Sequence, residues 1–196
     1  MTRKNLLLMT AAGALAGACL SLGGAQDKAH KLTVISPRKL ADSLHAVIAA
    51  DQQAYAAVLV QPAPADAQPV PASANSRPAP GSPSHAQLLR SAAQAIQKRG
   101  AEFSYTLRSL WPINESQGPQ TQVEQTGLEQ VAAHPEQNYY TEEELGGRSY
   151  FTAVYAERAT QSACVECHNR HPRSPRHDFV LNEVMGAIVV RVPLEF

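Results

Sequence analysis

Apolar positions recur at helical spacing along residues 36–60 and predict an amphipathic helix there. Ser36 is a suitable N-cap, and Pro37 suits the first helical position. Asp51 falls within the apolar stripe, so we expect its carboxylate to be paired or to face a polar neighbour. The stripe consists of Leu40, Leu44, Val47, Ile48, Tyr55, Val58 and Leu59.

Two more helices are indicated further along the chain. Residues 85–99 place apolar side chains on one face, and Gly100 is a typical residue to end such a helix. Thr121 and Glu124 have the spacing of a capping box for a helix that continues to about Ala133. This third helix is expected to bury Val123, Leu128, Val131 and Ala132.

Three segments have the patterns of β-strands. Residues 103–110 alternate apolar and polar side chains, which is typical of a half-exposed strand. Residues 148–155 follow a Gly-Gly turn and are rich in aromatic and β-branched side chains, and residues 186–194 form the last strand. Short helices alternating with separated strands predict an α+β fold.

Residues 61–84 are expected to be a linker. They contain seven prolines mixed with Ala, Ser, Asp and Gln, a composition that favours extended chain and cannot bury a core. The linker separates an N-terminal helical segment, residues 26–60, from the main domain, residues 85–196.

Residues 1–25 have the pattern of an export signal. Arg3 and Lys4 precede an uncharged apolar stretch, and small residues at 23–25 offer a cleavage site. The chain is therefore expected in the periplasm, with Cys19 lost on cleavage. Membrane attachment is expected only if the signal is retained as an anchor or Cys19 is lipidated.

The most informative motif is Cys164-Val165-Glu166-Cys167-His168. C-x-x-C-H is the spacing at which c-type haem is attached, with each cysteine forming a thioether and the histidine ligating the iron from the same turn. Loss of Cys19 would leave the mature chain with only the two motif cysteines, as suits an oxidising compartment. A redox-active disulfide or half of a zinc site are the alternatives.

The formal charge is balanced, and there is no stripe of basic residues, so nucleic-acid binding is not expected. Positive charge gathers only after the haem motif, where Arg170, Arg173 and Arg176 are candidates to pair with haem propionates.

Several segments recur in the same order in one known family. They are residues 110–114, 127–129, 147–155, 163–172 and 185–190. In these residues the chain resembles the c-type haem-binding, PAS-like periplasmic domains, long catalogued as a domain of unknown function. The resemblance covers residues 85–194 well and the first helix less well, and the linker is richer in proline than is usual in the family.

The resemblance implies a PAS-like antiparallel sheet flanked by helices, with an N-terminal helix and one covalently attached haem. It also implies that Cys164 and Cys167 carry the thioethers and that His168 is the proximal iron ligand. It does not settle the sixth ligand. His45 and Met185 are the candidates from the sequence, and an open sixth position is the alternative.

The resulting hypothesis is a mono-haem c-type cytochrome domain that senses redox state or a diatomic gas, O2, NO or CO, and passes the signal to an unidentified protein. The alternative is a simple electron-transfer cytochrome whose partner is another redox protein. A haem enzyme such as a peroxidase is not expected, because no distal acid–base motif is recognisable.

Overall fold

The structure, a computed structural model, describes residues 34–60 and 85–195. The expected signal peptide and linker lie outside these residues. The described chain is α+β, as predicted, and centres on a four-stranded antiparallel sheet in the order β1-β4-β3-β2. The strands are β1 (Ser104–Arg108), β2 (Tyr139–Leu145), β3 (Arg148–Arg158) and β4 (Val184–Pro193).

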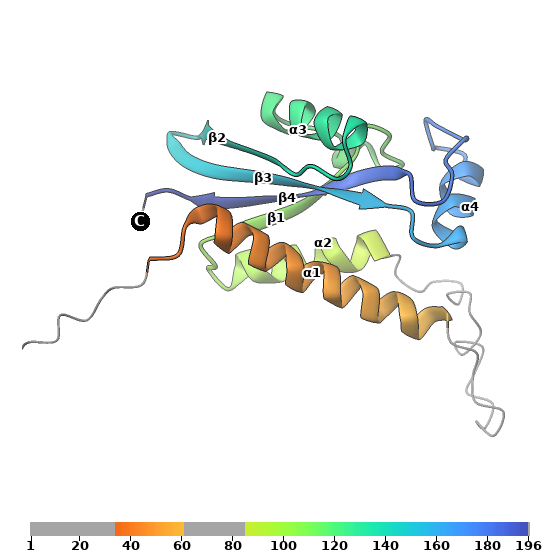
Figure 1. Ribbon diagram of the computed structural model, residues 1–196, viewed down its shortest axis with the longest axis horizontal. Coiled ribbons are helices and arrows are strands. Elements are labelled where there is room, and N and C mark those ends of the chain that lie inside the picture. Colours follow the sequence, from red (N-terminus) through yellow and green to blue (C-terminus); the bar gives the residue numbers. More distant parts are fainter. Residues whose placement is uncertain (1–33, 61–84, 196) are drawn as a thin grey trace, which may run out of the picture. The chain divides into compact units, whose positions relative to one another are not determined.

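Helices cover both faces of the sheet (Figure 1). On one face lie α1 (Pro37–Val60) and α2 (His85–Lys98), and on the other lies α3 (Gln122–Ala133). β4 is consequently buried along its whole length: Ile188 and Val190 face α1 and α2, while Ala187 and Val189 face α3. A strand packed on both faces reads as a continuous apolar run.

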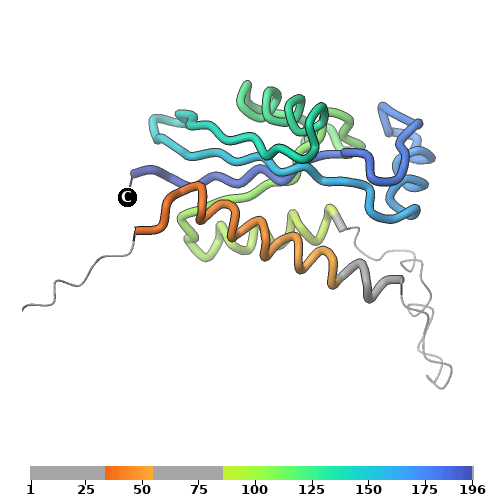
Figure 2. The backbone as a smooth tube through the Cα atoms, in the orientation of Figure 1, coloured from red at the N-terminus to blue at the C-terminus, as the bar shows by residue number. Residues whose placement is uncertain are grey.

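A fourth helix, α4 (Ser162–Arg170), lies at the end of the sheet between β3 and β4 (Figure 2). The C-terminus is at the opposite end of the sheet (Figure 1). A short 3₁₀ turn, η1 (Glu115–Gln117), follows β1. Within the described ranges, no helix combines the length and apolar character needed to cross a membrane.

The expected helices and strands are present, with several corrections. β2 was not expected, and it pairs with β3 across a tight turn at Gly146 and Gly147, whose φ values of 60° and 75° suit glycine. The haem motif lies in a helix rather than a short turn. Val47 is 62% exposed, although it was expected on the buried stripe of α1.

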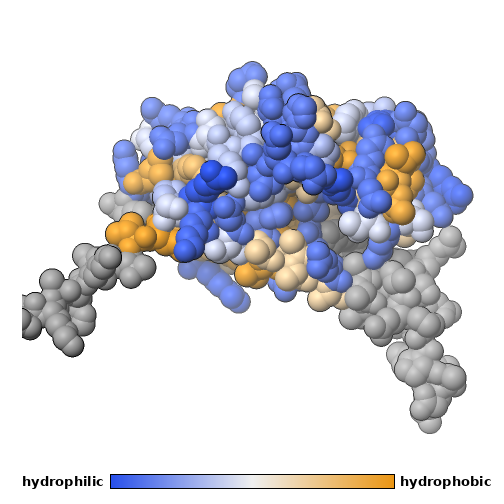
Figure 3. Space-filling model, in the orientation of Figure 1, coloured by the Kyte–Doolittle hydropathy of each residue, from blue (hydrophilic) through white to orange (hydrophobic). Residues whose placement is uncertain are grey.

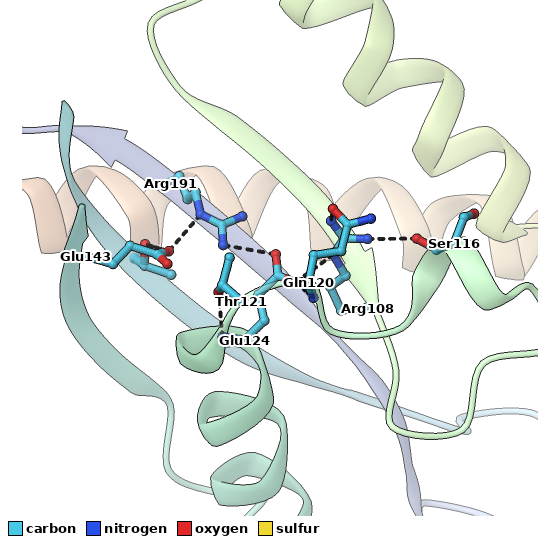
Figure 4. A network of polar contacts seen from close by, with 8 residues as sticks. Arg108, Ser116, Gln120, Thr121, Glu124, Glu143 and Arg191 are labelled. Carbon is cyan, nitrogen blue, oxygen red and sulfur yellow. Dashed lines mark hydrogen bonds and ion pairs between the residues drawn. The ribbon is translucent and has the colours of Figure 1, made fainter. Parts of the chain in front are cut away.

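β1 was expected to be half-exposed, and three of its five residues are only partly buried, but its polar face is covered at Arg108. Arg108 is buried there and forms an ion pair with Glu124 of α3, with 3.1 Å between Nε and Oε2. Glu124 also pairs with Arg191 of β4 at 2.9 Å, and Arg191 pairs with Glu143 of β2 at 2.8 Å (Figure 4). A buried chain of alternating charges thus connects α3 to three strands.

The capping of α3 differs slightly from the expected box. Thr121 is the N-cap, and its hydroxyl accepts a hydrogen bond from the Glu124 amide at 3.1 Å, as predicted. The Glu124 carboxylate instead accepts from the Gln120 amide at 2.7 Å, one residue before the cap. Glu124 therefore serves both the helix terminus and the ionic network, which explains why it is only 1% exposed.

Candidate functional site

α4 brings the three residues of the haem motif together at one end of the sheet. Cys167 and His168 follow Cys164 by three and four residues, so the three side chains lie at neighbouring positions on one face of the helix. Both cysteines are free thiols; Cys164 is partly buried and Cys167 is exposed. This arrangement leaves both sulfur atoms open to modification beside the histidine.

Burial raises the pKa of the Cys164 thiol, so the neutral thiol is the favoured form at neutral pH. A reactive C-x-x-C cysteine of the redox type has the opposite property, a lowered pKa near a helix N-terminus. The environment of Cys164 therefore argues against a catalytic disulfide. Within the described residues, no group of three or more His, Cys, Asp and Glu side chains is arranged to hold a metal ion.

His168 is held in a partly buried position against an aromatic ring. Its imidazole meets the ring of Phe179 edge to face, with centroids 5.8 Å apart. Burial lowers the pKa of His168, and the neighbouring His171 lowers it further, so the neutral ring that can ligate iron is favoured. Its Nδ1 atom is buried with no hydrogen-bond partner in the described protein.

A small apolar cluster lies beneath α4. It buries Ala159, Phe179 and Met185, with Trp111, Cys164 and Val165 packed against them. Met185, a candidate sixth ligand, therefore lies in the same cluster as the first cysteine of the motif. Its backbone is fixed by Ser109, whose hydroxyl donates to the Met185 carbonyl at 2.6 Å.

His45, the other candidate sixth ligand, is in a different environment. It lies on α1 and stacks on the ring of Tyr155 in β3, with centroids 3.9 Å apart and planes 4° apart. Burial lowers the pKa of His45, and nearby Asp42 partly offsets this effect. The imidazole is thus neutral but is committed to an aromatic stack beside the apolar core of α1.

The loop that follows α4 folds back on the helix. The side chain of Asn169 donates to the Phe179 carbonyl at 2.9 Å and accepts from the Phe179 amide at 3.0 Å. These two bonds position Phe179 beside His168. The sequence did not indicate the contact between Asn169 and Phe179, because the two residues are ten positions apart and meet only in the folded loop.

The three arginines after the motif have unequal surroundings. Arg176 lies over the rings of Trp111 and Phe179, at 5.0 and 4.4 Å from their centroids, and pairs with Asp178 and Glu183. Arg170 is exposed and 3.9 Å from Glu166, and Arg173 is exposed. Arg170 and Arg173 are therefore the freer of the three to meet an acidic group.

Comparison with known proteins places the chain in a family. The model of the Tll0287-like family matches residues 30–193. The chain belongs to the Tll0287-like family. The resemblance to c-type haem-binding domains drawn from the sequence is thereby confirmed. Among curated protein sequences, none matches.

One solved relative of the Tll0287-like chain is the crystal structure of the cyanobacterial heme-protein Tll0287. It superposes with a TM-score of 0.50 at 13% identity and covers 82% of this chain and 98% of that one. At this identity, the likeness concerns the fold. It shows that the two chains share an overall fold.

The residues of the site fit a covalently attached haem. The two free thiols would supply the two thioether sites, and His168 would supply one axial ligand. The Nδ1 atom of His168 is a buried polar atom without a hydrogen-bond partner among the described residues. The aromatic and sulfur side chains around them give the apolar surroundings that a porphyrin face requires.

Proposed function

We propose that this chain is a periplasmic mono-haem c-type cytochrome domain that senses redox state or a diatomic gas. Cys164 and Cys167 hold the haem, and His168 is its proximal ligand. The observation that carries the proposal is the placement of these three residues on one face of α4, against an apolar cluster at the end of the sheet. A PAS-like fold, typical of sensor domains, agrees with the four-stranded antiparallel sheet and its helices.

Bound haem supplies one-electron chemistry and an iron that accepts axial ligands. The protein's contribution is to position those ligands. Asn169 fixes Phe179 against the His168 ring, and Ser109 fixes the backbone at Met185. Of the two candidate sixth ligands, Met185 is supported by its place in the apolar cluster against which Cys164 packs, whereas His45 is held in its stack with Tyr155.

Sensing requires that a change at the iron alters the surrounding structure. We expect the loop 171–183 to transmit a change at the iron. It contacts His168 through Phe179 and leads into β4, which carries Met185. A shift at either axial position would move one end of the loop. The unidentified partner would then recognise the changed surface.

Electron transfer is the second candidate function. The loop beside α4 exposes Val180 and Leu181, which are 62% and 53% exposed. Figure 3 shows apolar surface over this region, flanked by hydrophilic surface. An apolar spot with a polar rim next to the haem is the kind of surface that a transient redox partner contacts.

Hydrogen exchange of the haem-loaded protein separates the two functions. The exchange of backbone amides would be measured in the ferric protein, in the ferrous protein, and in the ferrous protein with CO or NO. Sensing predicts altered protection in the loop 171–183 and in β4 in at least one comparison. Unchanged protection in every state, together with rapid electron self-exchange, would contradict sensing and support electron transfer. Turnover of peroxide by the same preparation would contradict both.

A further inference from the structure

Glu157 is a carboxyl group that the proposed function does not yet use. It lies near the end of β3, two residues after Tyr155 and opposite Gly186 of β4, where the register of the two strands shifts. β3 leads directly from here into α4 (Figure 1). The Glu157 side chain reaches α1, where its Oε2 atom accepts a hydrogen bond from Gln52 Nε2 at 3.2 Å.

The partners of Glu157 differ from those of two other acids with buried side chains, Glu124 of α3 and Glu143 of β2. Glu124 and Glu143 each pair with guanidinium groups, as expected for carboxylates that stay ionised when buried. Among the side chains that the structure describes, Glu157 is paired with the neutral amide of Gln52, and no lysine, arginine or histidine of these side chains forms an ion pair with it. A partly buried carboxylate without a cation is poorly compensated and gains from protonation.

The electrostatics follow from this placement. Burial raises the pKa of Glu157 to about 7, against the opposing effect of the hydrogen bond from Gln52. Its charge in turn raises the pKa of Cys164, so the carboxylate is close enough to affect the first cysteine of the haem motif. A group that titrates near neutral pH therefore lies beside the haem attachment point.

The other ionisable groups near Glu157 differ from it in their partners or in their exposure. The hydroxyl of Tyr155 donates a hydrogen bond to Asp42, and burial raises the pKa of Tyr155 far above its ordinary value. His45 is neutral in its stack on Tyr155, and Asp51, next to Gln52 on α1, is exposed. The facing position on β4 is a glycine, Gly186.

We propose that Glu157 is the redox-linked proton acceptor of this domain. It binds one proton from water when a one-electron donor reduces the haem iron, and it releases that proton when the iron is reoxidised. Reduction removes one positive charge near the carboxylate, which stabilises the protonated acid relative to the anion. The inference rests on the proposed attachment of haem at Cys164 and Cys167.

The coupling makes the reduction potential depend on pH. Because the ferrous state favours protonated Glu157, the potential falls as the pH rises between the pKa of Glu157 in the ferric state and its higher pKa in the ferrous state. Outside this interval, Glu157 contributes no slope. At most one proton is taken up for each electron.

The test is a redox titration of the haem-loaded protein at a series of pH values around neutrality. The wild type is expected to show the falling potential. Glu157→Gln is expected to lose the slope and to stay near the wild-type value at acid pH, because glutamine has the shape and neutrality of the protonated acid. Glu136→Gln, which removes an exposed carboxylate that pairs with Arg158 of β3, is the control and should keep the wild-type slope.

A second readout does not depend on the variant folding. Reduced-minus-oxidised infrared spectra of the wild type at neutral pH should contain the C=O band of a newly protonated carboxylic acid, and the band should shift when glutamate is labelled with carbon-13. An undiminished slope in Glu157→Gln, or the absence of a glutamate-derived band, would overturn the inference. If the protein binds haem but gives either of these results, only the role of Glu157 is contradicted. If the protein attaches no haem, the proposed function itself is contradicted.

Discussion

At the scale of single residues, the haem motif gains its meaning from the neighbours of His168. The sequence places Cys164, Cys167 and His168 on adjacent positions, but it does not show which side chains surround them. The structure adds Phe179 against the imidazole and Met185 in the cluster that contacts Cys164. These contacts lead to a specific expectation for the sixth ligand.

Met185→Leu should open the sixth coordination position. Leucine nearly conserves the volume of methionine, so the cluster around Trp111 and Phe179 stays packed, but it has no sulfur donor. We expect the ferrous haem-loaded variant to bind CO readily, with the wild type resisting CO, as followed by absorbance spectra. The matched variant His45→Gln should behave as the wild type. CO binding gained by His45→Gln and not by Met185→Leu would assign the ligand to His45 instead.

The buried ionic network gives a second prediction at this scale. Glu124→Gln removes the charge that Arg108 and Arg191 share. It leaves the buried Arg108 without a carboxylate among the described residues, and Arg191 with Glu143 alone. Breaking a buried pair in this way lowers the free energy of unfolding by about 3 kcal/mol or more. Urea unfolding of the two variants Glu124→Gln and Glu136→Gln provides the measurement.

The control variant tests whether burial is the cause. Glu136 also pairs with an arginine, Arg158, but its side chain is 84% exposed. The loss in Glu136→Gln should stay below about 1 kcal/mol. Equal losses in the two variants would contradict the importance assigned to the buried network.

At the scale of elements, the sequence predicted α1, α2, α3, β1, β3 and β4 from local signals. These signals were apolar periodicity in the helices and β1, a capping box before α3, and runs of aromatic, β-branched or apolar residues in β3 and β4. β2 was missed because it is an edge strand with three consecutive glutamates, which gives no apolar alternation. One of them, Glu143, is nevertheless buried as the partner of Arg191. A charge-rich strand of this kind is recognisable only when its buried cationic partner is known.

Helix α3 packs on the sheet through a glycine. A β-carbon at Gly127 would lie 2.6 Å from a methyl group of Val154 and 2.9 Å from the ring of Tyr139. Gly127→Ala should therefore push α3 away from β2 and β3 and destabilise the fold by about 1–3 kcal/mol, despite the higher helix propensity of alanine. Thermal unfolding measures this; an unchanged or raised Tm would show that α3 is not held this closely.

At the scale of the whole molecule, two layers of helices enclose the sheet, and the haem motif lies at one end of it. The sequence predicted the α+β class and the residues of the motif. It did not predict the pairing of Glu157 with Gln52, because the two are 105 residues apart and are joined only when α1 packs on β3. Contacts of this range depend on the tertiary fold, and local patterns do not encode them.

The central claim is the covalent attachment of haem through Cys164 and Cys167, and intact-protein mass spectrometry after acid–acetone extraction tests it most directly. For this measurement, the full chain is expressed together with a haem-attachment system, and Cys19→Ser is the control for a cysteine outside the motif. We predict that the wild type and Cys19→Ser gain the mass of one haem and that the double variant Cys164→Ser/Cys167→Ser gains none. A wild-type chain that leaves extraction without haem would contradict the account and return the two cysteines to a disulfide or metal-binding role.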